Sequence, residues 1–478
     1  MWTVEQTGQR ALGFKSLDEE VHVDSVPVTG TVPDWLRGSL VRVTPALMDG
    51  GGRTIKHWFD GAAMLNAFGF GDGGVSYGSR FLETDYLGAV RKGEVRIGFG
   101  QDPCRSLFKR VMSMNDVNKF DNANVNLQEL GRRYIAMVET PLPVEFDPKT
   151  LATLGKPRWP DKEADGQVTT AHPHYDYATD EVVNYTVKFG PKTTYRIYTA
   201  GEVGAKRRLI GSLPVKKPGY MHSFGMSERY VVLAENPLLV NPMSMPLSKK
   251  AFIDNYEWQP ERGTRFIVMD RHTGELEGIH ETEAFFCFHH VNSFERDGEL
   301  VVDLIAYEDP SVIHVLDLDK LRGGGTPAAL GSTGLRRYRI ALDGSGVTRE
   351  DIAPDVGPEL PRINYRRNNM RDYRWMYAIA NSPEADWSDH LVKVDVNTGD
   401  AKLWAEPGCY PGEPVFVDRP GGTAEDDGAI LSVILDANAE RSFLLILDAA
   451  TFEEVARAEA PHHIPFGFHG QYFRDKGV

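Results

Sequence analysis

The stretch Leu391-Val392-Lys393-Val394-Asp395-Val396-Asn397-Thr398-Gly399 holds the pattern that decides the fold of this 478-residue chain. An alternating apolar segment ends in an aspartate, and a threonine follows three residues later. Alternation with a period of two predicts a half-buried strand. The aspartate side chain can cap the turn that follows, and Gly399 can supply a positive φ where the chain reverses. The stretch therefore predicts the corner of a β-hairpin.

The same corner occurs three more times, and short strands are predicted between the copies. The other corners are Val144–Asp147 with Thr150, Ile267–Asp270 with Thr273 and Gly274, and Leu445–Asp448 with Thr451. The strands between them are predicted at Tyr230–Glu235, Leu300–Tyr307, Val312–Asp317, Trp375–Ala380 and Ile430–Asp436. Small antiparallel sheets repeated around an axis are typical of a β-propeller, and at about 40–50 residues per blade the length suits six to eight blades. Two stacked β-sandwiches are the alternative.

Proline and glycine are spread along the chain, so we expect residues 1–478 to form a single domain. Two segments, roughly 103–114 and 236–256, are predicted to be insertions with some helix, the first capped by Asp102 before Pro103. Both mix large apolar residues with Lys or Arg. This composition fits a surface that rests on a membrane, but it also fits a lid packed on the β core.

Composition excludes several classes of protein. The formal net charge of −15 argues against a nucleic-acid partner. The three cysteines, Cys104, Cys287 and Cys409, have no paired spacing, which indicates a reducing compartment rather than a disulfide framework. No secretory signal and no apolar run of about 18 residues is visible. The expected location is cytoplasmic, and peripheral contact with a membrane stays open.

Four histidines stand in apolar or small-residue surroundings and lie 50, 67 and 180 residues apart along the chain. They are His172, His222, His289 and His469. Only a closed architecture that returns the chain repeatedly to one axis could gather them. Four neutral imidazoles would then form a metal site without thiolate or carboxylate ligands. Most of the other histidines are expected to be ordinary, including His22, His57, His272, His280, His314 and His390.

Three glutamates also lie in apolar or proline-containing strings: Glu139, Glu359 and Glu413. Glutamate is seldom buried without a partner. A metal-bound imidazole usually donates its other ring N–H to a carboxylate or a carbonyl. The three glutamates are therefore candidates to orient the histidines, although each taken singly could equally be a glutamate at the rim of a loop.

Seven strings, in order, resemble the carotenoid cleavage oxygenases over about residues 30–472. They are Pro33-Asp34-Trp35-Leu36-Arg37-Gly38, His57-Trp58-Phe59-Asp60-Gly61, Thr170-Ala171-His172-Pro173-His174, His222-Ser223-Phe224-Gly225-Met226, Phe288-His289-His290-Val291-Asn292, Glu413-Pro414-Val415-Phe416-Val417 and Gly467-Phe468-His469-Gly470. Residues 409–459 are similar to the animal-type branch, which includes central carotene cleavers and the retinoid isomerohydrolase.

This resemblance implies an all-β, seven-bladed propeller with a dome of helices and loops over the metal face. It implies one Fe(II) per chain, held by His172, His222, His289 and His469. By resemblance, Glu139, Glu359 and Glu413 orient His222, His289 and His469 in that order, and His172 has no glutamate. The second histidines of the doublets, His174 and His290, would be neighbours rather than ligands.

The activity implied by the resemblance is that of a non-haem Fe(II) dioxygenase. It would cleave a central alkene bond of a carotenoid or apocarotenoid with O2, the 15,15′ bond being favoured, to give retinal-type aldehydes. The expected partners are O2 and a hydrophobic polyene, and no side chain is predicted to act as a nucleophile or base. Phe285-Phe286 and Phe466 are candidates for tunnel walls or for ordinary core.

Three alternatives remain open at this point. The first is a stilbenoid-cleaving dioxygenase, which would need a phenol-activating pair such as Tyr86 and Lys119. The second is an isomerohydrolase acting on retinyl esters. The third is a carotenoid-binding propeller without turnover. The exact substrate and the oligomeric state are not predicted.

Overall fold

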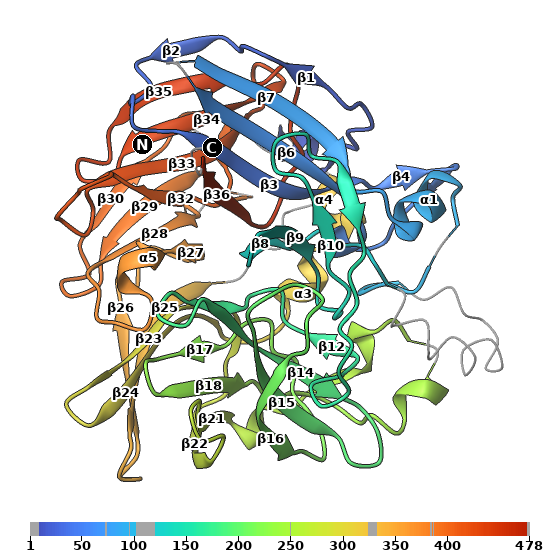
Figure 1. The fold of residues 1–478 in the computed structure, drawn as a ribbon, viewed down its shortest axis with the longest axis vertical. Helices are drawn as coiled ribbons and strands as arrows, with labels where there is room; N and C mark the ends of the chain where they lie inside the picture. Colours follow the sequence, from blue (N-terminus) through green and yellow to red (C-terminus); the bar gives the residue numbers. More distant parts are fainter. Residues whose placement is uncertain are drawn as a thin grey trace.

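Seven antiparallel sheets of four to six strands surround one axis in the computed structural model, which describes residues 9–71, 74–94, 96–101, 120–248, 250–323, 332–382, 385 and 387–475. Figure 1 shows strands β8, β27 and β36 near the centre and strands β2, β16, β22 and β30 at the rim. The fold is a seven-bladed β-propeller. The predicted fold class is confirmed, and the sandwich alternative is wrong.

Blades 1 to 4 lie within residues 22–282, except that blade 1 also contains the last strand of the chain. The strands of each blade are named from the axis outward. Blade 1 contains β36 (Gly470–Arg474), β3 (Gly38–Leu47), β6 (Ala62–Gly71), β7 (Gly74–Phe81) and β1 (His22–Val23); blade 2 contains β8 (Asn126–Leu130), β9 (Arg133–Met137), β10 (Val144–Phe146) and β11 (Thr153–Gly155). Blade 3 contains β12 (Val168–Thr169) and β13 (His174–Asp176), then β14 (Glu181–Lys188), β15 (Thr194–Ala200) and β16 (Arg208–Pro214); blade 4 contains β17 (Gly225–Met226), β18 (Tyr230–Glu235), β21 (Thr264–Asp270) and β22 (Leu276–Thr282).

Blades 5 to 7 complete the ring. Blade 5 contains β23 (Phe286–Arg296), β24 (Glu299–Tyr307), β25 (Thr333–Ala341) and β26 (Val347–Ile352); blade 6 contains β27 (Pro358–Arg362), β28 (Trp375–Ala380), β29 (His390–Asp395) and β30 (Ala401–Trp404). Blade 7 contains β31 (Cys409–Pro411) and β32 (Val415–Asp418), then β33 (Gly428–Asp436), β34 (Arg441–Asp448), β35 (Glu454–Glu459) and β2 (Val28–Gly30). Two small sheets lie outside the blades: β4 (Asp49–Gly50) with β5 (Arg53–Thr54), and β19 (Leu238–Val240) with β20 (Tyr256–Trp258).

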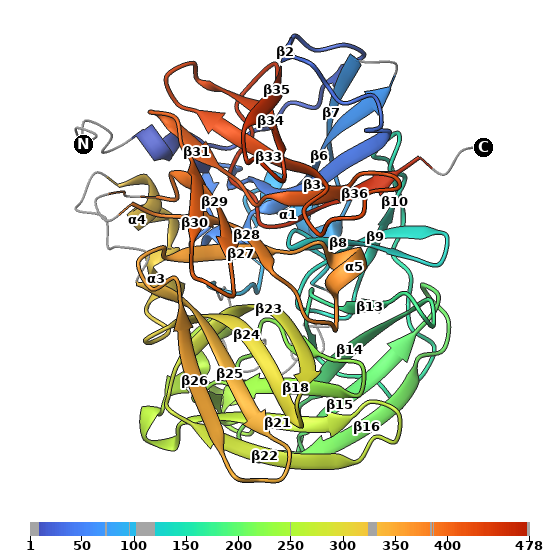
Figure 2. The same cartoon turned by 90° about the vertical axis from the view of Figure 1, so that its left-hand side faces the viewer.

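The helices of the described residues are short and connect or cap the blades. They are α1 (Asp85–Arg91), α3 (Val312–Val315), α4 (Leu318–Arg322) and α5 (Tyr365–Asn368), with the 3-10 helices η1 (Gln9–Phe14), η2 (Trp58–Asp60), η4 (Met245–Leu247), η5 (Ile253–Asn255) and η6 (Pro260–Arg262). Figure 2 shows α3 and α4 at one face of the propeller and α5 at the other. No helix among these described segments is long and apolar enough to cross a membrane.

The two ends of the chain close the ring, because each end adds a strand to a blade formed mainly by the other end. Strand β36 near the C-terminus pairs with β3 in blade 1, where Leu40 faces Tyr472. Strand β2 near the N-terminus pairs with β35 in blade 7, where Val28 faces Ala458. Closure removes most free strand edges. It also brings residues from the whole sequence to one axis.

The four predicted corners all occupy the same place, the turn between the third and fourth strands of a blade. In each corner, the Oδ1 atom of Asp147, Asp270, Asp395 or Asp448 accepts a backbone N–H from the turn. The residue four positions after each aspartate has a positive φ: Leu151, Gly274, Gly399 and Phe452. The corners are therefore one structural device used in blades 2, 4, 6 and 7.

Two further corners of this kind were missed by the sequence pattern. Asp176 and Asp436 also accept turn N–H groups, and Asp180 and Glu440 have positive φ four residues later. The strand before Asp176 is too short to show alternation, and no threonine follows Asp436 at the third position. Neither satisfied the pattern in the sequence.

One predicted strand, Val312–Asp317, is wrong, because Val312–Val315 is helix α3. Its β-branched residues suggested a strand, but Val312 and Ile313 are buried against Tyr220, Phe286 and aromatic neighbours at the axial face. Tertiary packing overrides the local preference here. The other four predicted strands are present as β18, β24, β28 and β33.

The predicted insertion at 236–256 forms the β19–β20 hairpin with two single-turn 3-10 helices at its tip. Leu238, Leu239 and Val240 are buried, and Leu238 packs with Tyr220 and Ile253 on the β core. These three residues therefore form the base of the hairpin and do not face a membrane, which agrees with the lid alternative for this part of the insertion. The other predicted insertion, 103–114, lies outside the described residues, as does its proposed cap Asp102.

Candidate metal centre

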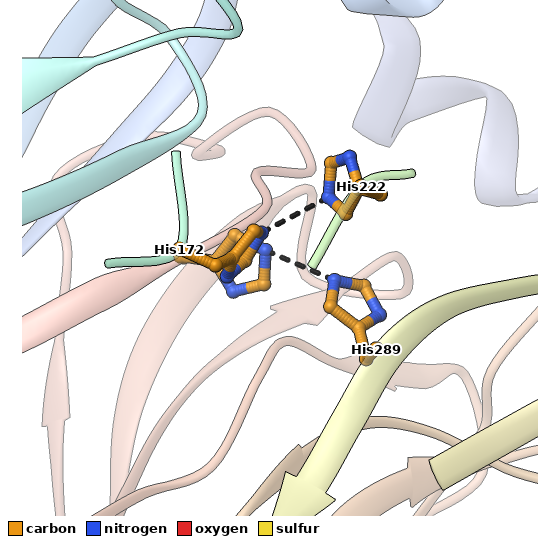
Figure 3. A group of neighbouring side chains, drawn as sticks. His172, His222 and His289 are labelled. Carbon is orange, nitrogen blue, oxygen red and sulfur yellow. Dashed lines mark hydrogen bonds between the residues drawn. The ribbon is translucent and has the colours of Figure 1, made fainter. Parts of the chain in front are cut away.

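The four histidines predicted to bind a metal lie together at the propeller axis. His172 stands between β12 and β13, His222 precedes β17, His289 is within β23, and His469 immediately precedes β36. They come from blades 3, 4, 5 and 1. One ring nitrogen from each histidine lies within 4.8 Å of the corresponding nitrogens of the other three. Figure 3 shows the rings of His172, His222 and His289 pointing toward one another.

The nitrogens that face inward are the Nε2 atoms. The Nε2 atoms of His172 and His222 are 3.0 Å apart, and those of His289 and His469 are 3.3 Å apart. Two nitrogens bound at right angles to one ion, at about 2.1 Å each, would lie about 3.0 Å from each other. The observed spacings therefore match nitrogens that share one small cation.

The outward nitrogens of three rings rest on the three predicted glutamates. His222 Nδ1 lies 2.7 Å from Glu139 Oε1. His289 Nδ1 lies 2.6 Å from Glu359 Oε2. Residue His469 follows the same scheme, with its Nδ1 atom 2.7 Å from Oε1 of Glu413. For the fourth ring, that of His172, no such carboxylate is found among the described residues.

These contacts determine which nitrogen carries the proton when a ring is neutral. A carboxylate only accepts hydrogen bonds, so each Nδ1 atom beside a glutamate carries a proton, and in the neutral ring the Nε2 atom then carries the lone pair. The Nε2 atoms of His289 and His469 face each other across 3.3 Å. Two lone pairs at that distance repel unless a proton or a metal ion lies between them. The donor set fits a metal ion.

Burial also shifts the pKa values of residues in the cluster. Burial, followed by the charge of the neighbouring histidines, lowers the pKa of both His172 and His469 well below the usual 6.5. The rings of His172 and His469 are thus held neutral, which is the form that binds metals. In Glu359, burial acts to raise the pKa, but the contact with His289 and the hydrogen bonds from the Leu360 backbone and the Tyr307 hydroxyl outweigh it, and the pKa is lowered. The carboxylate remains available to accept the Nδ1 proton.

Irregularities in two strands aim one histidine and its glutamate at the axis. The β23–β24 register shifts between Cys287 and His290, so that Phe288 and His289 bulge from the ladder. The β27–β28 register shifts just after Glu359, where Leu360 has a φ of +50°. A β-bulge bends a strand and redirects a side chain, and it is often found beside functional sites. The two bulges lie in adjacent blades and bring His289 and Glu359 into contact.

Every blade contributes one residue to this cluster. Blades 1, 3, 4 and 5 carry the histidines, and blades 2, 6 and 7 carry Glu139, Glu359 and Glu413. Glu139 follows β9, Glu359 is within β27, and Glu413 lies between β31 and β32. The site therefore depends on closure of the whole ring and cannot form in a fragment that lacks a blade.

Contacts around the glutamates were not predicted from the sequence. The hydroxyl of Tyr220 donates to Glu139 at 2.9 Å, and that of Tyr307 donates to Glu359 at 2.9 Å. Tyr220 could have been noticed because it stands two residues before His222. Tyr307 is the last residue of an apolar strand, and nothing in the sequence around it indicates this contact.

Two guanidinium groups surround Glu413. An Nη atom of Arg42 lies 3.6 Å from Glu413 Oε2, and one of Arg362 lies 3.6 Å from Oε1. Arg42 also donates to the backbone oxygens of Glu413 and Phe468 at 3.1 and 3.0 Å. Arg42 is 3% exposed within the apolar strand β3. A charged residue in an apolar strand is the sequence feature that could have identified it.

The second histidines of the two doublets have separate partners. His174 contacts the hydroxyl of Tyr365 and the backbone oxygen of Phe224. His290 Nδ1 lies 2.8 Å from the hydroxyl of Ser223. Neither belongs to the group of four converging nitrogens. Their placement agrees with the expectation that they are neighbours of the site.

Aromatic rings border the cluster on the side of η2. Phe59 lies 6.1 Å from Phe288 and 5.0 Å from Phe468, measured between ring centroids. Phe288 in turn lies 5.3 Å from the ring of His222. Phe288 and Phe468 are buried and directly precede two of the clustered histidines. The immediate surroundings of the site are thus apolar.

Two of the three aromatic residues that the sequence suggested as tunnel walls, Phe285 and Phe466, lie away from the site. Phe285 packs on Phe266 and Tyr338 within the core of blades 4 and 5. Phe466 stacks on Trp387 in the cluster around η1. Both are ordinary core residues. Phe286, in contrast, packs on Phe288 near the axis.

Comparison with known proteins shows the family. The carotenoid-cleaving dioxygenase (mitochondrial) of Macaca fascicularis is 34% identical over 94% of this chain and 91% of its own length. The β,β-carotene 15,15′-dioxygenase of Mus musculus is 32% identical over 96% of this chain and 90% of its own length. The family model described as retinal pigment epithelial membrane protein matches residues 14–474. The chain belongs to the carotenoid oxygenase family.

Solved structures of carotenoid oxygenases share the fold. A variant of the Synechocystis apocarotenoid oxygenase superimposes with a TM-score of 0.85 at 28% identity, over 98% of both chains. Cobalt-substituted Synechocystis apocarotenoid oxygenase gives a TM-score of 0.84, also at 28% identity and over 98% of both chains. The resemblance seen in the sequence motifs is confirmed, and the chain is a carotenoid-cleaving type of enzyme by family.

The phenol-activating pair considered for a stilbenoid-cleaving member of this family is not supported. The hydroxyl of Tyr86 is buried and donates to the backbone oxygen of Asp60 at 2.7 Å. Burial, followed by the charge of Asp60, raises its pKa well above 10. The hydroxyl is thus committed to the fold and is not available to deprotonate a phenol. Lys119 lies outside the described residues.

Proposed function

We propose that this chain is a non-haem Fe(II) dioxygenase that cleaves a central double bond of a carotenoid or apocarotenoid, giving retinal-type aldehydes. The observation that carries the proposal is the convergence of four Nε2 atoms at the propeller axis, with three Nδ1 atoms held by glutamates. One Fe(II) per chain would be held by His172, His222, His289 and His469. When bound, the iron supplies O2 activation next to an electron-rich alkene.

The residues of the chain supply position, charge balance and exclusion of water. Glu139, Glu359 and Glu413 fix three rings and offset the charge of a dication held by neutral ligands. Four protein ligands would leave a bound iron able to take a further ligand, and an open position distinguishes a catalytic from a structural metal site. No titratable side chain is required to attack the substrate.

The apolar rings beside the histidines favour a polyene over a polar substrate. Phe59, Phe288 and Phe468 form one wall of the site. Burial of apolar surface stabilises a bound ligand by about 25 cal/mol per Å², before the cost of association. A long isoprenoid offers such surface along its whole length. A dry environment also protects the reacting centre from water.

Assay of defined substrates tests the proposal. Protein loaded anaerobically with Fe(II) would be incubated with O2 and with β-carotene, an apocarotenal, resveratrol or a retinyl ester, and the products separated by chromatography. We expect aldehydes from a carotenoid or apocarotenoid, labelled when ¹⁸O2 is used. Cleavage of resveratrol alone would instead support a stilbenoid-cleaving activity, and unlabelled retinol formed from the ester would support an isomerohydrolase.

We further propose that the tip of the β19–β20 hairpin contacts a membrane that holds the apolar substrate. The base of this hairpin is buried, but Met243 and Leu247 at its tip are 61% and 67% exposed. Large apolar side chains with this exposure are suited to insertion into the interface of a bilayer. Peripheral contact at this tip would let a polyene leave the membrane without crossing water.

A further inference from the structure

His172 differs from the other three clustered histidines in what holds it. The rings of His222, His289 and His469 each rest on a glutamate through Nδ1. Among the described residues, His172 has no such carboxylate. It stands in the short connection between β12 and β13. Its position on the axis must therefore be fixed in another way.

The hydroxyl of Thr170 connects His172 to a second clustered histidine. Thr170 Oγ1 accepts the backbone N–H of His172 at 3.0 Å. The same hydroxyl donates to the backbone oxygen of His222 in a short hydrogen bond. Thr170 is 1% exposed, so water does not replace these contacts. A single buried hydroxyl thus joins the backbones of two residues whose rings converge.

Two asparagines hold the carbonyl groups that precede His172. Asn126 of β8 donates from Nδ2 to the backbone oxygen of Ala171 at 2.9 Å. Asn184 of β14 donates from Nδ2 to the backbone oxygen of Thr170 at 3.0 Å. The peptide groups on both sides of Ala171 are therefore fixed from blades 2 and 3.

The orientation of both amides is determined by their other contact. Asn126 Oδ1 accepts the backbone N–H of Leu127 at 2.8 Å, and Asn184 Oδ1 accepts that of Tyr185 at 2.7 Å. Each oxygen thus faces a donor, which leaves the NH2 group directed at the carbonyl. Both asparagines are buried. Such buried amides are costly to leave unpaired.

We propose that Thr170, Asn126 and Asn184 are the positioning residues of His172. They place its ring on the axis through the backbone, whereas the glutamates place the other three rings through Nδ1. This inference rests on the proposed metal site and deepens it. Thr170 acts on two ligands because it also holds His222, whereas Asn126 and Asn184 act on the segment before His172 alone.

The expected effects follow from this difference. Thr170→Val keeps the volume and removes both hydrogen bonds, so metal affinity should fall about 10–100-fold, as for other residues that hold metal ligands. Thr170→Ser keeps the hydroxyl and should restore wild-type affinity. Asn126→Leu should weaken binding less than Thr170→Val, because His222 remains held.

The test measures metal binding in the full-length protein. Co(II) would be titrated into the metal-free protein, and the dissociation constant and the visible absorption of the bound ion recorded for each variant. We expect Thr170→Val to weaken binding and shift the absorption bands, because a displaced imidazole changes the ligand field. Thr186→Val is the matched control: Thr186 is also a fully buried threonine of blade 3, but its hydroxyl contacts the backbone oxygen of Ala164.

Each outcome decides the proposal. Wild-type affinity and spectrum in folded Thr170→Val would overturn it, as would an equal loss of affinity in Thr186→Val, which would indicate a general effect on the core. If Thr170→Val does not fold, the same criterion applies to Asn126→Leu. Failure of the wild-type protein to bind Co(II) or Fe(II) would instead overturn the metal site itself, so the two failures are distinguishable.

Discussion

Glu413 contacts both the side chain of His469 and the backbone that follows it. Its Oε1 atom lies 2.7 Å from His469 Nδ1, and its Oε2 atom accepts the backbone N–H of Gly470 at 3.0 Å. These two contacts fix the ring angle and the peptide plane of one clustered histidine together. Because β36 begins at Gly470, the carboxylate also ties the site to the strand that closes the ring.

Replacement of Glu413 by glutamine should weaken metal binding without unfolding the protein. The amide keeps the size of the side chain but loses the charge that balances the cation and the acceptor strength at Nδ1. We expect the dissociation constant for Fe(II) to rise about 10–100-fold, in line with other carboxylates that hold metal-bound histidines. Anaerobic metal titration measures this, and unchanged affinity would contradict the role given to Glu413.

The two histidines of the doublet at 289–290 should behave differently. His289→Ala removes one of the four converging nitrogens and should abolish retention of iron. His290→Ala removes a contact with Ser223 and should leave iron bound. Metal content per chain, measured after gel filtration of each variant, distinguishes them. Equal metal content in the two variants would be inconsistent with the assignment of the first histidine as the ligand.

Loss of Arg42 should destabilise the fold strongly. Arg42→Met leaves the buried carboxylate of Glu413 with one fewer charged neighbour and two backbone oxygens without their donor. Removing one partner of a buried ion pair typically costs about 3–5 kcal/mol. Arg441→Met, which breaks an ion pair with Glu459 at the surface, should cost less than about 1 kcal/mol. Urea denaturation of both variants compares the two costs.

Gly274 and Gly399 occupy the same position in two of the Asp–Thr corners and can be compared by mutation. At Gly274, φ is +78° and an added Cβ would lie 2.0 Å from the backbone oxygen of Ile210. At Gly399, φ is also +78°, but the nearest atom would be 3.4 Å away. Gly399→Ala should lower the free energy of unfolding by about 1 kcal/mol, because alanine disfavours a positive φ. Gly274→Ala should cost more in the same urea denaturation experiment, and equal costs would show that the contact with Ile210 has no effect.

Acid should destabilise the protein partly through His57. Burial lowers the pKa of His57 to about 3, whereas in the unfolded chain it is about 6.5. Between these values the unfolded state binds a proton that the folded state does not. The free energy of unfolding should therefore fall as the pH drops below 6.5, by up to about 1.4 kcal/mol per pH unit from this group.

His57→Gln removes that titration. Unfolding free energies of the wild type and the variant, measured from pH 7 to pH 4.5, should show a shallower decrease for His57→Gln. Parallel pH dependences would mean that His57 does not contribute. The residue is suited to this test because it lies outside the group of four histidines and contacts the backbone of Ile313 at 2.8 Å.

Membrane contact at the hairpin tip can be measured by co-sedimentation with phosphatidylcholine vesicles. Replacing Met243 and Leu247 by serine should reduce the bound fraction because both side chains are exposed and apolar. Leu403→Ser is the control, since Leu403 is 60% exposed on the outer strand of blade 6. A loss of binding equal to that in the control, or no loss, would argue against the tip as the contact.

The sequence predicted the parts of this fold that depend on local pattern. The Asp–Thr corners were recognisable because capping chemistry and strand alternation leave a signature, and the residues around His172 and His469 carried family motifs. The segment Val312–Asp317 was mistaken for a strand because burial of Val312 and Ile313 against distant aromatic residues decides its conformation. Thr170 and Asn126 were not recognised as holding His172, because their partners are backbone groups that no sequence pattern reveals.

The central claim is that four imidazoles from four blades hold one iron. X-ray absorption of the protein loaded anaerobically with Fe(II), combined with metal analysis, tests it most directly. The account predicts one iron per chain, with scattering from four histidine rings at about 2.1 Å. Iron bound by fewer than four imidazoles, or no stoichiometric iron, would contradict it.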